Sequence, residues 1–196
     1  VRKELGKKLA KRAPCREASL VTGMPDSGTI ASLGYAEESG VPYEQSVVRN
    51  RYVGRTFIEP TSRVRHLGVR IKLNPITEVL QGKNVVVVDD SIVRGTTCER
   101  MISMIKSCGA NQVHVRISSP PVRFPCYYGI DTPTRVELAA ARMNLQQLEQ
   151  EVGADSLAYI TEEDLLEAIG LPAQSVCTAC FSGDYMEGGE EYEPQL

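Results

Sequence analysis

The chain has 196 residues, of which 42% are hydrophobic and 24% are charged, and its net charge is −3. This length and composition predict a soluble globular protein with one hydrophobic core and room for a small appendage. The balance of 22 basic and 25 acidic side chains argues against a nucleic-acid-binding protein, and no apolar run approaches the roughly 20 residues of a membrane span.

The first segment, residues 1–14, reads VRKELGKKLAKRAP and has the pattern of a basic amphipathic helix. It lacks the apolar centre of a signal peptide, so we expect a cytoplasmic protein. Because the chain begins with Val1, we also expect it to be a piece of a longer protein.

Strand and helix patterns then alternate in the manner of a parallel α/β sheet. The apolar run 18–23 predicts a strand, and residues 25–40 predict a helix that packs through Ile30, Leu33, Gly34 and Ala36. A second strand precedes a helix at 98–109 and a third strand at 112–119. Helical patterns follow at 134–143, 145–153 and 161–170, and a Gly/Glu-rich tail starts at Gly188. We expect a parallel sheet flanked by helices over residues 1–150, with a C-terminal helical extension and tail over 151–196.

The run VVVVDDSIVRGTT, residues 85–97, predicts a ligand site. Asp89 and Asp90 directly follow a fully apolar strand, and two adjacent carboxylates there need a cation or several donors to compensate them. The small residues that follow can hold a phosphate through backbone N–H groups and the hydroxyls of Ser91, Thr96 and Thr97. An ordinary N-cap aspartate would explain one acid but not two, and neither a G-x-G-x-x-G motif nor a P-loop is present.

Between Arg49 and Pro75 the alternating pattern breaks down, and basic residues gather instead. The segment carries Arg49, Arg51, Arg55, Arg63, Arg65, Arg70 and Lys72. We interpret it as a long functional loop, the alternative being a solvated basic surface.

The six cysteines suggest several kinds of chemistry. Cys177 and Cys180 form a C-x-x-C that could bind zinc, carry out redox chemistry or help to bind an iron-sulfur cluster, and their spacing alone does not decide. We expect Cys98 and Cys108 to be small buried residues of a helix. His66 and His114 lack the neighbours of a catalytic histidine.

The run at 85–97 resembles the phosphoribosylpyrophosphate (PRPP) motif of type I phosphoribosyltransferases. The segments VTGMPDSG, RNRYVGRTFIEP, GVRIKLNP, SSPPVRFPCYYGID and VCTACFSGDY are similar, in order, to the synthase half of the glutamine PRPP amidotransferase family. The resemblance covers nearly all of residues 5–185. It implies the type I phosphoribosyltransferase fold and the formation of phosphoribosylamine and diphosphate from PRPP and ammonia, the first committed step of purine biosynthesis. Nothing in the chain matches that family's N-terminal glutaminase domain, so we expect free ammonia rather than glutamine to serve as substrate.

The resemblance also implies roles for particular residues. Asp89 and Asp90 would hold the ribose hydroxyls and Mg²⁺, with Ser27 contributing to the metal site. Arg51, Arg55 and Lys72 are candidates to stabilise the departing diphosphate as catalytic residues. Substrate binding is assigned to Asp26, Ser27, Gly28, Asp89, Asp90, Ser91, Ile92, Val93, Arg94, Gly95, Thr96 and Thr97.

In a subset of this family, segments similar to FPCYYGID and VCTACF hold a [4Fe-4S] cluster. That resemblance implies that Cys126, Cys177 and Cys180 are ligands, with a fourth cysteine in an upstream part that this chain does not contain; Cys15 does not match its position. We therefore expect the three thiols to converge and the cluster to be incomplete or absent. We also expect a homo-oligomer with no nucleic-acid or membrane partner. The alternative function is a non-catalytic PRPP-binding regulator of the same fold.

Overall fold

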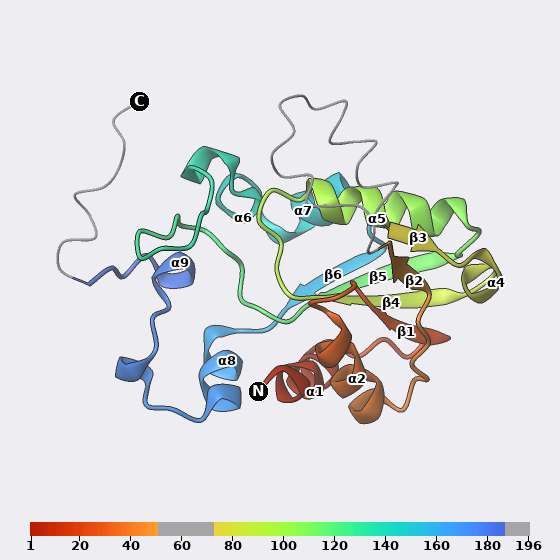
Figure 1. Ribbon diagram of the computed structural model, residues 1–196, viewed down its shortest axis with the longest axis horizontal. Helices are drawn as coiled ribbons and strands as arrows, with labels where there is room; N and C mark the ends of the chain where they lie inside the picture. Colours follow the sequence, from red (N-terminus) through yellow and green to blue (C-terminus); the bar gives the residue numbers. More distant parts are fainter. Residues whose placement is uncertain (51–72, 187–196) are drawn as a thin grey trace.

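The computed structural model describes residues 1–50 and 73–186, and its centre is a four-stranded parallel sheet (Figure 1). The strand order is β1 (Leu20–Gly23), β4 (Asn84–Asp89), β5 (Gln112–Ile117) and β6 (Ser156–Tyr159). The first three strands fall where the sequence predicts them. The fourth was not predicted, and it extends the sheet past the boundary expected at residue 150.

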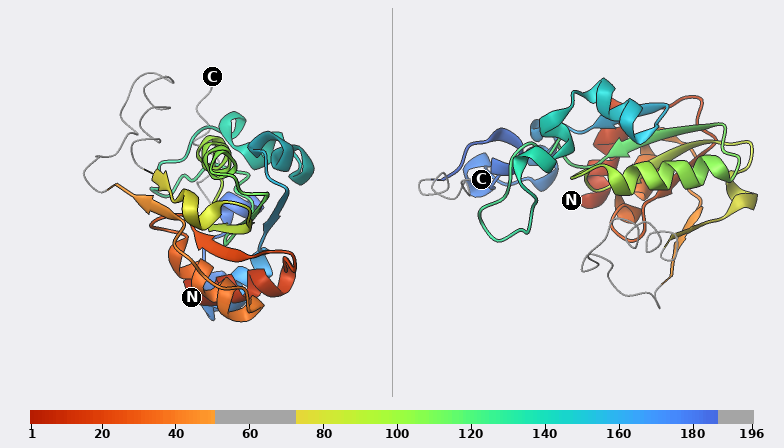
Figure 2. Two further views of the ribbon diagram at one scale, coloured as in Figure 1. Left: turned by 90° about the vertical axis from the view of Figure 1, so that its right-hand side faces the viewer. Right: turned by 90° about the horizontal axis from the view of Figure 1, so that it is seen from above.

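Helices cover both faces of this sheet, as the two rotated views make clear (Figure 2). On one face lie α1 (Arg2–Arg12), α2 (Thr29–Ser39) and α8 (Glu162–Ile169), and on the other lie α5 (Thr96–Ser107) and α7 (Leu145–Val152). In β4, Val85 and Val87 pack toward α5 while Val86 and Val88 pack toward α1 and α2. A strand buried on both faces needs apolar side chains at every position, which explains the unbroken valine run.

The inward face predicted for α2 is wrong for its two large aliphatic residues. Ile30 remains 46% exposed and Leu33 38%, whereas Ala31 and Tyr35 are buried. The reason lies in the crossing of α1 and α2: a Cβ on Gly34 would stand 2.0 Å from the Lys3 carbonyl oxygen. The two helix backbones touch through small residues, so this face, rather than the larger aliphatic one, turns inward.

The face of β5 beneath α1 carries polar side chains inside the core. Arg116 is buried, and its guanidinium donates from Nε to the Ala13 carbonyl and from Nη1 to the Val115 carbonyl and the Ser156 hydroxyl, each at 2.9 Å. His114 lies two residues earlier on the same face, with Nδ1 2.9 Å from the same Ser156 hydroxyl. Hydrogen bonds from Arg116 therefore tie the loop after α1 to the centre of the sheet.

Helices α1 and α8, which lie far apart in sequence, are joined by ion pairs. Arg12 pairs with Asp164 and Lys8 with Glu167. Helix α8 begins with a capping box in which Thr161 accepts from the Asp164 N–H at 3.2 Å. None of the described helices is both long and apolar enough to cross a membrane.

The loop predicted between Arg49 and Pro75 is framed by a pair of short strands that the sequence does not reveal. Strands β2 (Val47–Arg49) and β3 (Leu73–Pro75) pair antiparallel, with Arg49 opposite Leu73, and α4 (Thr77–Leu80) follows. The catalytic candidates Arg51, Arg55 and Lys72 lie outside the described residues, as do Arg63, Arg65, His66 and Arg70.

The C-terminal part contains shorter elements than predicted. The expected helix at 134–143 is interrupted at Leu138, whose extended backbone separates η2 (Arg135–Glu137) from α6 (Ala139–Arg142). The side chain of Leu138 is fully buried. Beyond α8 follow η3 (Ala173–Ser175) and α9 (Ala179–Ser182).

Asp155, immediately before β6, supports a prediction about how stability depends on pH. Burial alone would raise the pKa of its carboxyl, but the Val113 N–H at 2.7 Å and Lys106 at 2.9 Å lower that pKa below its ordinary value. A lowered pKa stabilises the fold above the unfolded-state value of about 3.9, and this stabilisation is lost as pH falls through the folded-state pKa.

We therefore expect Asp155→Asn to cost about 1 kcal/mol of unfolding free energy at neutral pH, since Lys106 loses its partner at a partly exposed site. The cost should shrink toward zero in strong acid. Thermal unfolding across the pH range measures this, with Asp131→Asn in an exposed loop as the control. An equal loss at both ends of the range would contradict the assignment.

Candidate functional site

Two loops meet at the carboxyl edge of the sheet. The loop after β1, residues 24–28, contacts the end of β4: the Met24 N–H donates to the Val88 carbonyl at 2.8 Å. A Cβ on Gly28 would stand 2.2 Å from the same carbonyl oxygen and 3.1 Å from the Asp89 Cα. Only a residue without a side chain fits there, and the sequence-predicted Asp26, Ser27 and Gly28 thus lie beside the acidic pair.

The two carboxylates organise the turn that follows β4. Oδ1 of Asp89 accepts the Asp90 N–H and Oδ1 of Asp90 accepts the Ser91 N–H, both at 2.8 Å. The Asp89 carbonyl accepts the N–H of Ser118, the residue that follows β5, at 2.9 Å. Each carboxylate keeps a second oxygen that these bonds leave unused.

The acidic pair is electrostatically unfavourable by itself. Burial, and then the neighbouring Asp90 charge, raise the pKa of Asp89 well above its ordinary value. Such a group favours a proton or a cation at its side. Carboxylate and hydroxyl oxygens are the ligands that Mg²⁺ prefers, so Asp89, Asp90 and Ser27 fit that ion in their chemistry.

The loop between Ser91 and Thr97 leads into the amino end of α5. Its backbone is held from the side by the Ala139 N–H, which donates to the Val93 carbonyl at 2.8 Å, and by the buried side chain of Ile92. Gly95 adopts the left-handed conformation, with φ at +88°, which favours glycine. Thr96 and Thr97 are exposed at the start of a 12-residue helix. Free N–H groups at such an end attract anions.

Basic residues flank these loops. Arg49 of β2 donates to Asp26 Oδ2 at 2.9 Å, linking the framed arginine segment to the loop after β1. Arg94 instead pairs with Glu137 at 3.1 Å. The sequence did not predict the contact between Arg49 and Asp26. The only signal for it was that Arg49 belongs to the basic segment between residues 49 and 75.

Of the predicted cysteine ligands, Cys126 lies in the loop after β5, and Cys177 and Cys180 lie at α9. Burial raises the pKa of the Cys180 thiol, and the charges of Cys126 and Cys177 raise it further. Among the described residues, these three thiols do not form a group whose ligand atoms all lie within 4.8 Å of one another, so their convergence on one metal ion stays a prediction. The Cys180 carbonyl accepts the N–H groups of Arg123 and Phe124 at 2.9 and 3.1 Å. Cys15 lies before β1, at the amino edge of the sheet, whereas Cys126 follows β5 at the carboxyl edge.

The other two cysteines belong to the α5 region. Cys98 is buried in the helix, where desolvation raises the pKa of its thiol to about 12. Cys108 caps the helix end and is only partly buried against the core, a small departure from the fully buried position expected.

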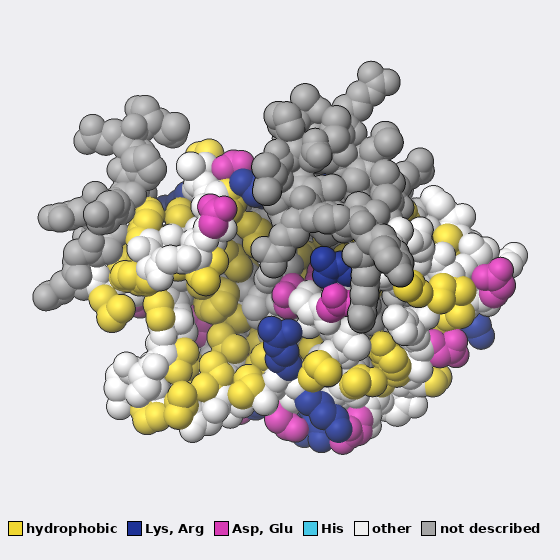
Figure 3. All heavy atoms as spheres, in the orientation of Figure 1, with side chains coloured by type: hydrophobic (Ala, Val, Ile, Leu, Met, Phe, Trp, Pro, Cys, Tyr) yellow, Lys and Arg dark blue, Asp and Glu magenta, His cyan; other side chains and the backbone are white. Residues whose placement is uncertain are grey.

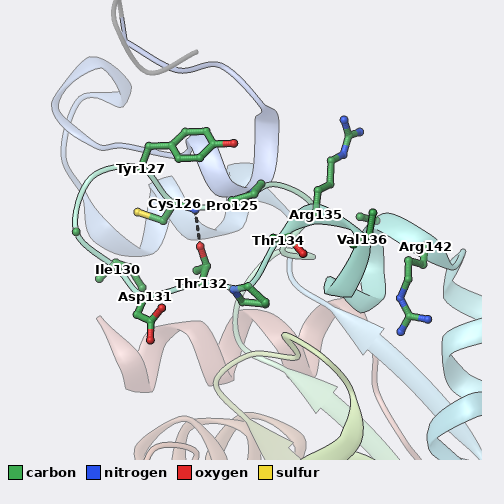
Figure 4. Close-up of a pocket in the computed structure, with 13 residues that line it drawn as sticks. Pro125, Cys126, Tyr127, Ile130, Asp131, Thr132, Thr134, Arg135, Val136 and Arg142 are labelled. Atoms are coloured by element: carbon green, nitrogen blue, oxygen red, sulfur yellow. Dashed lines mark hydrogen bonds between the residues drawn. The ribbon is translucent and has the colours of Figure 1, made fainter. Parts of the chain in front are cut away.

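A cavity of about 900 Å³ lies next to Cys126 (Figure 4), and neither Asp89 nor Asp90 lines it. Its walls include Cys126, Tyr127, Ile130 and Val136. The Cys126 N–H donates to the Thr132 hydroxyl at 2.7 Å and fixes the turn that forms one wall. Hydrophobic side chains also gather on the side of the molecule where α9 lies (Figure 3). None of the predicted PRPP-binding residues lines this cavity.

Comparison with known proteins identifies close relatives. No protein-family model matches the chain. It is 50% identical over 184 residues to the amidophosphoribosyltransferase of Synechococcus elongatus, covering 94% of this chain and 37% of that relative. It is 50% identical over 188 residues to the same-named enzyme of Bacillus subtilis, covering 94% and 39%. The chain therefore spans less than half the length of the curated relatives it matches.

Two solved structures agree with the fold. Both have a TM-score of 0.84 and 50% identity and cover 94% of this chain. One is described as the glutamine PRPP amidotransferase from B. subtilis complexed with ADP and GMP, and 41% of it is covered. The other is described as the allosteric regulatory enzyme of purine biosynthesis, with 40% covered. They confirm the predicted type I phosphoribosyltransferase fold.

Proposed function

Because the chain is related to the amidophosphoribosyltransferases over 94% of its length, we propose that it carries their phosphoribosyltransferase activity. The reaction would transfer the phosphoribosyl group of PRPP to ammonia, giving phosphoribosylamine and diphosphate, at the first committed step of purine biosynthesis. The observation that carries the proposal is the contact of two loops at one sheet edge, where Gly28 touches the backbone of Val88 and Asp89.

The first part of the proposed mechanism is to hold the substrate at both ends. The 91–97 loop and the amino end of α5 would bind the 5′-phosphate through backbone N–H groups and the hydroxyls of Thr96 and Thr97. The second oxygens of Asp89 and Asp90 would accept hydrogen bonds from the ribose hydroxyls. The loop of Asp26, Ser27 and Gly28 would then lie along the diphosphate.

The second part is to stabilise charge at the breaking bond. Departure of diphosphate leaves positive charge on the sugar, and the carboxyl groups of Asp89 and Asp90, with a bound cation to offset their mutual repulsion, would stabilise that charge. Mg²⁺, when bound through Ser27, Asp89 and Asp90 with the substrate, would supply positive charge to the leaving oxygens. Arg51, Arg55 and Lys72 remain candidates for the same role from outside the described residues. Arg49, held at the adjacent loop by Asp26, is a further basic group at this edge.

For the cysteine trio we propose a clamp around an iron-sulfur centre. Cys126, Cys177 and Cys180 would supply three thiolates, the number of cysteines that the family resemblance assigns to this chain, and thiolates are the usual ligands of iron-sulfur clusters. The Tyr185 hydroxyl donates to the Pro125 carbonyl at 2.6 Å, and the Met186 N–H donates to Tyr128 at 2.8 Å. These bonds would keep the C-terminal segment against the trio. We also propose a homo-oligomer as the working assembly.

The test is the release of diphosphate from PRPP by the purified chain. We expect release that requires both ammonia and Mg²⁺, with no glutamate produced from glutamine, because the buried Cys15 thiol, with a pKa of about 11, is a poor nucleophile. The names of the relatives are those of enzymes, which speaks against the alternative of a regulator. PRPP binding without any diphosphate release would favour the regulator and overturn the proposal.

A further inference from the structure

Three chemically distinct side chains converge at the amino edge of the sheet, opposite the PRPP loops. They are Cys15 and Glu17, in the loop between α1 and β1, and His114 of β5. A ligand atom from each lies within 4.8 Å of the other two. Although Cys15 and His114 stand far apart in sequence, the parallel sheet brings the loop and the strand together.

The histidine at this place has an unmet bonding requirement. His114 is 3% exposed, and its Nε2 is buried without a hydrogen-bond partner. Glu17 Oε1 is the nearest acid, at 3.8 Å, which is too long for a hydrogen bond. A buried polar nitrogen without a partner costs free energy, so a group that accepts its lone pair would be stabilising.

The other ring nitrogen of His114 is already oriented. Nδ1 lies 2.9 Å from the Ser156 hydroxyl, which also accepts from Arg116. If Nδ1 donates to that hydroxyl, Nε2 presents its lone pair, the arrangement usual for histidine ligands of metals. Burial, and then Arg116, lower the pKa of His114.

A nucleophilic role for Cys15 fits these surroundings poorly. The thiol is 3% exposed, and burial, with Glu17 beside it, raises its pKa to about 11. A reactive cysteine needs a lowered pKa and access for its substrate. The same thiol next to an imidazole and a carboxylate suits a metal ion, which displaces the proton itself.

We propose that Cys15, Glu17 and His114 form a binding site for a zinc-like divalent cation. Thiolate, imidazole and carboxylate form a ligand set that Zn²⁺ accepts, with a fourth position open to water. Thiolate and carboxylate together balance the two positive charges of the ion, beside the cationic Arg116. Glu17 is 55% exposed in its side chain and so is free to move the short distance toward the ion. The bound ion would fasten the loop after α1 to β5.

The experiment uses the full chain with Cys126, Cys177 and Cys180 replaced by serine, so that the other thiol group does not bind the probe. Titration with Co²⁺ should give one ion per chain and a thiolate-to-cobalt absorption band, and Zn²⁺ should displace the Co²⁺ and raise the unfolding temperature. Cys15→Ser should abolish the band. Glu17→Gln should weaken Co²⁺ binding roughly tenfold or more, while Glu44→Gln, another exposed acid, should not.

Three results would each overturn the site: no thiolate band in this background, a band that survives Cys15→Ser, or equal Co²⁺ affinity in the Glu17→Gln and Glu44→Gln variants. Since Glu17 is exposed, its replacement leaves the core intact and keeps the test valid if Cys15→Ser fails to fold. Because every readout is binding or unfolding, failure here leaves the proposed PRPP chemistry untouched.

Discussion

Asp89→Asn is expected to slow diphosphate release from PRPP by roughly 100-fold or more and, at the same time, to raise the melting temperature of the free protein. The amide keeps the size of the carboxylate and can still accept the Asp90 N–H. It removes the charge that would face the ribose and Mg²⁺. It also removes the cost of ionising a desolvated carboxyl directly beside Asp90, and for this reason we expect the melting temperature to rise.

Steady-state assays and thermal unfolding of the same samples measure both effects. Asp90→Asn should lose activity in the same way, while Asp131→Asn, on an exposed loop, should change neither quantity. Wild-type turnover in both site variants would mean that the carboxylates only shape the turn. A loss of activity accompanied by a lower melting temperature would contradict the electrostatic argument.

Gly28→Ala is expected to have the second largest effect, because it forces the two loops apart. Its Cβ would stand 2.2 Å from the Val88 carbonyl oxygen, which belongs to the sheet and cannot move aside cheaply. Overpacking of this kind costs about 1–3 kcal/mol. The shift should also move Asp26 and Ser27 away from the acids and abolish PRPP binding.

Gly153→Ala provides a matched control for this variant. Gly153 ends α7 with φ at +73° and has open space where a Cβ would go. The cost there is backbone strain of about 1–2 kcal/mol, with no effect on the site. Comparison of PRPP binding and unfolding in the two variants separates the steric contact from the general cost of replacing glycine. Unchanged PRPP binding in Gly28→Ala would show that the loop contact does not shape the site.

Much of the sheet could be predicted because its signal is local. Four valines followed by two acids indicate a buried strand and its end without knowledge of the neighbouring strands. Residues 156–159 of β6 read SLAY and contain no apolar run of this kind, because the strand buries only Leu157 fully and so does not need one. That strand exists through its partners: it pairs with β5, and Asp155 just before it bonds to Val113.

The short strands β2 and β3 are a second example of strands that the sequence alone does not predict. Each strand has three residues, and the pairing of Val47 with Pro75 joins positions 28 residues apart. Neither strand is long enough to show an alternating pattern, and the arginines between them dominate the composition. Pairing between strands so far apart in the sequence depends on the tertiary fold, so the local pattern of either strand does not predict it.

Helix α2 was predicted correctly as an element, but its inward face was not. Hydrophobic periodicity assumes that the largest apolar side chains point to the core, whereas here Gly34 meets the backbone of α1 directly. The polar pair His114 and Arg116 was equally hidden, because their position between valines indicates a strand but not the buried bonds that they make. Convergence of Cys15 with His114 likewise depends on the assembled sheet.

The ion pairs between α1 and α8 connect the beginning of the described chain to a region more than 150 residues later. During synthesis from the amino end, α1 can pack on α2 early, but Lys8 and Arg12 form their ion pairs with Glu167 and Asp164 only after α8 has been synthesised. The loop after α1 waits as well, since Ser156 of β6 completes the bonds of Arg116. A nascent chain halted before β6 would therefore expose the basic helix α1 and would leave Arg116 without its hydrogen bond to Ser156. We expect such an incomplete chain to be cleaved by proteases more readily than the complete one.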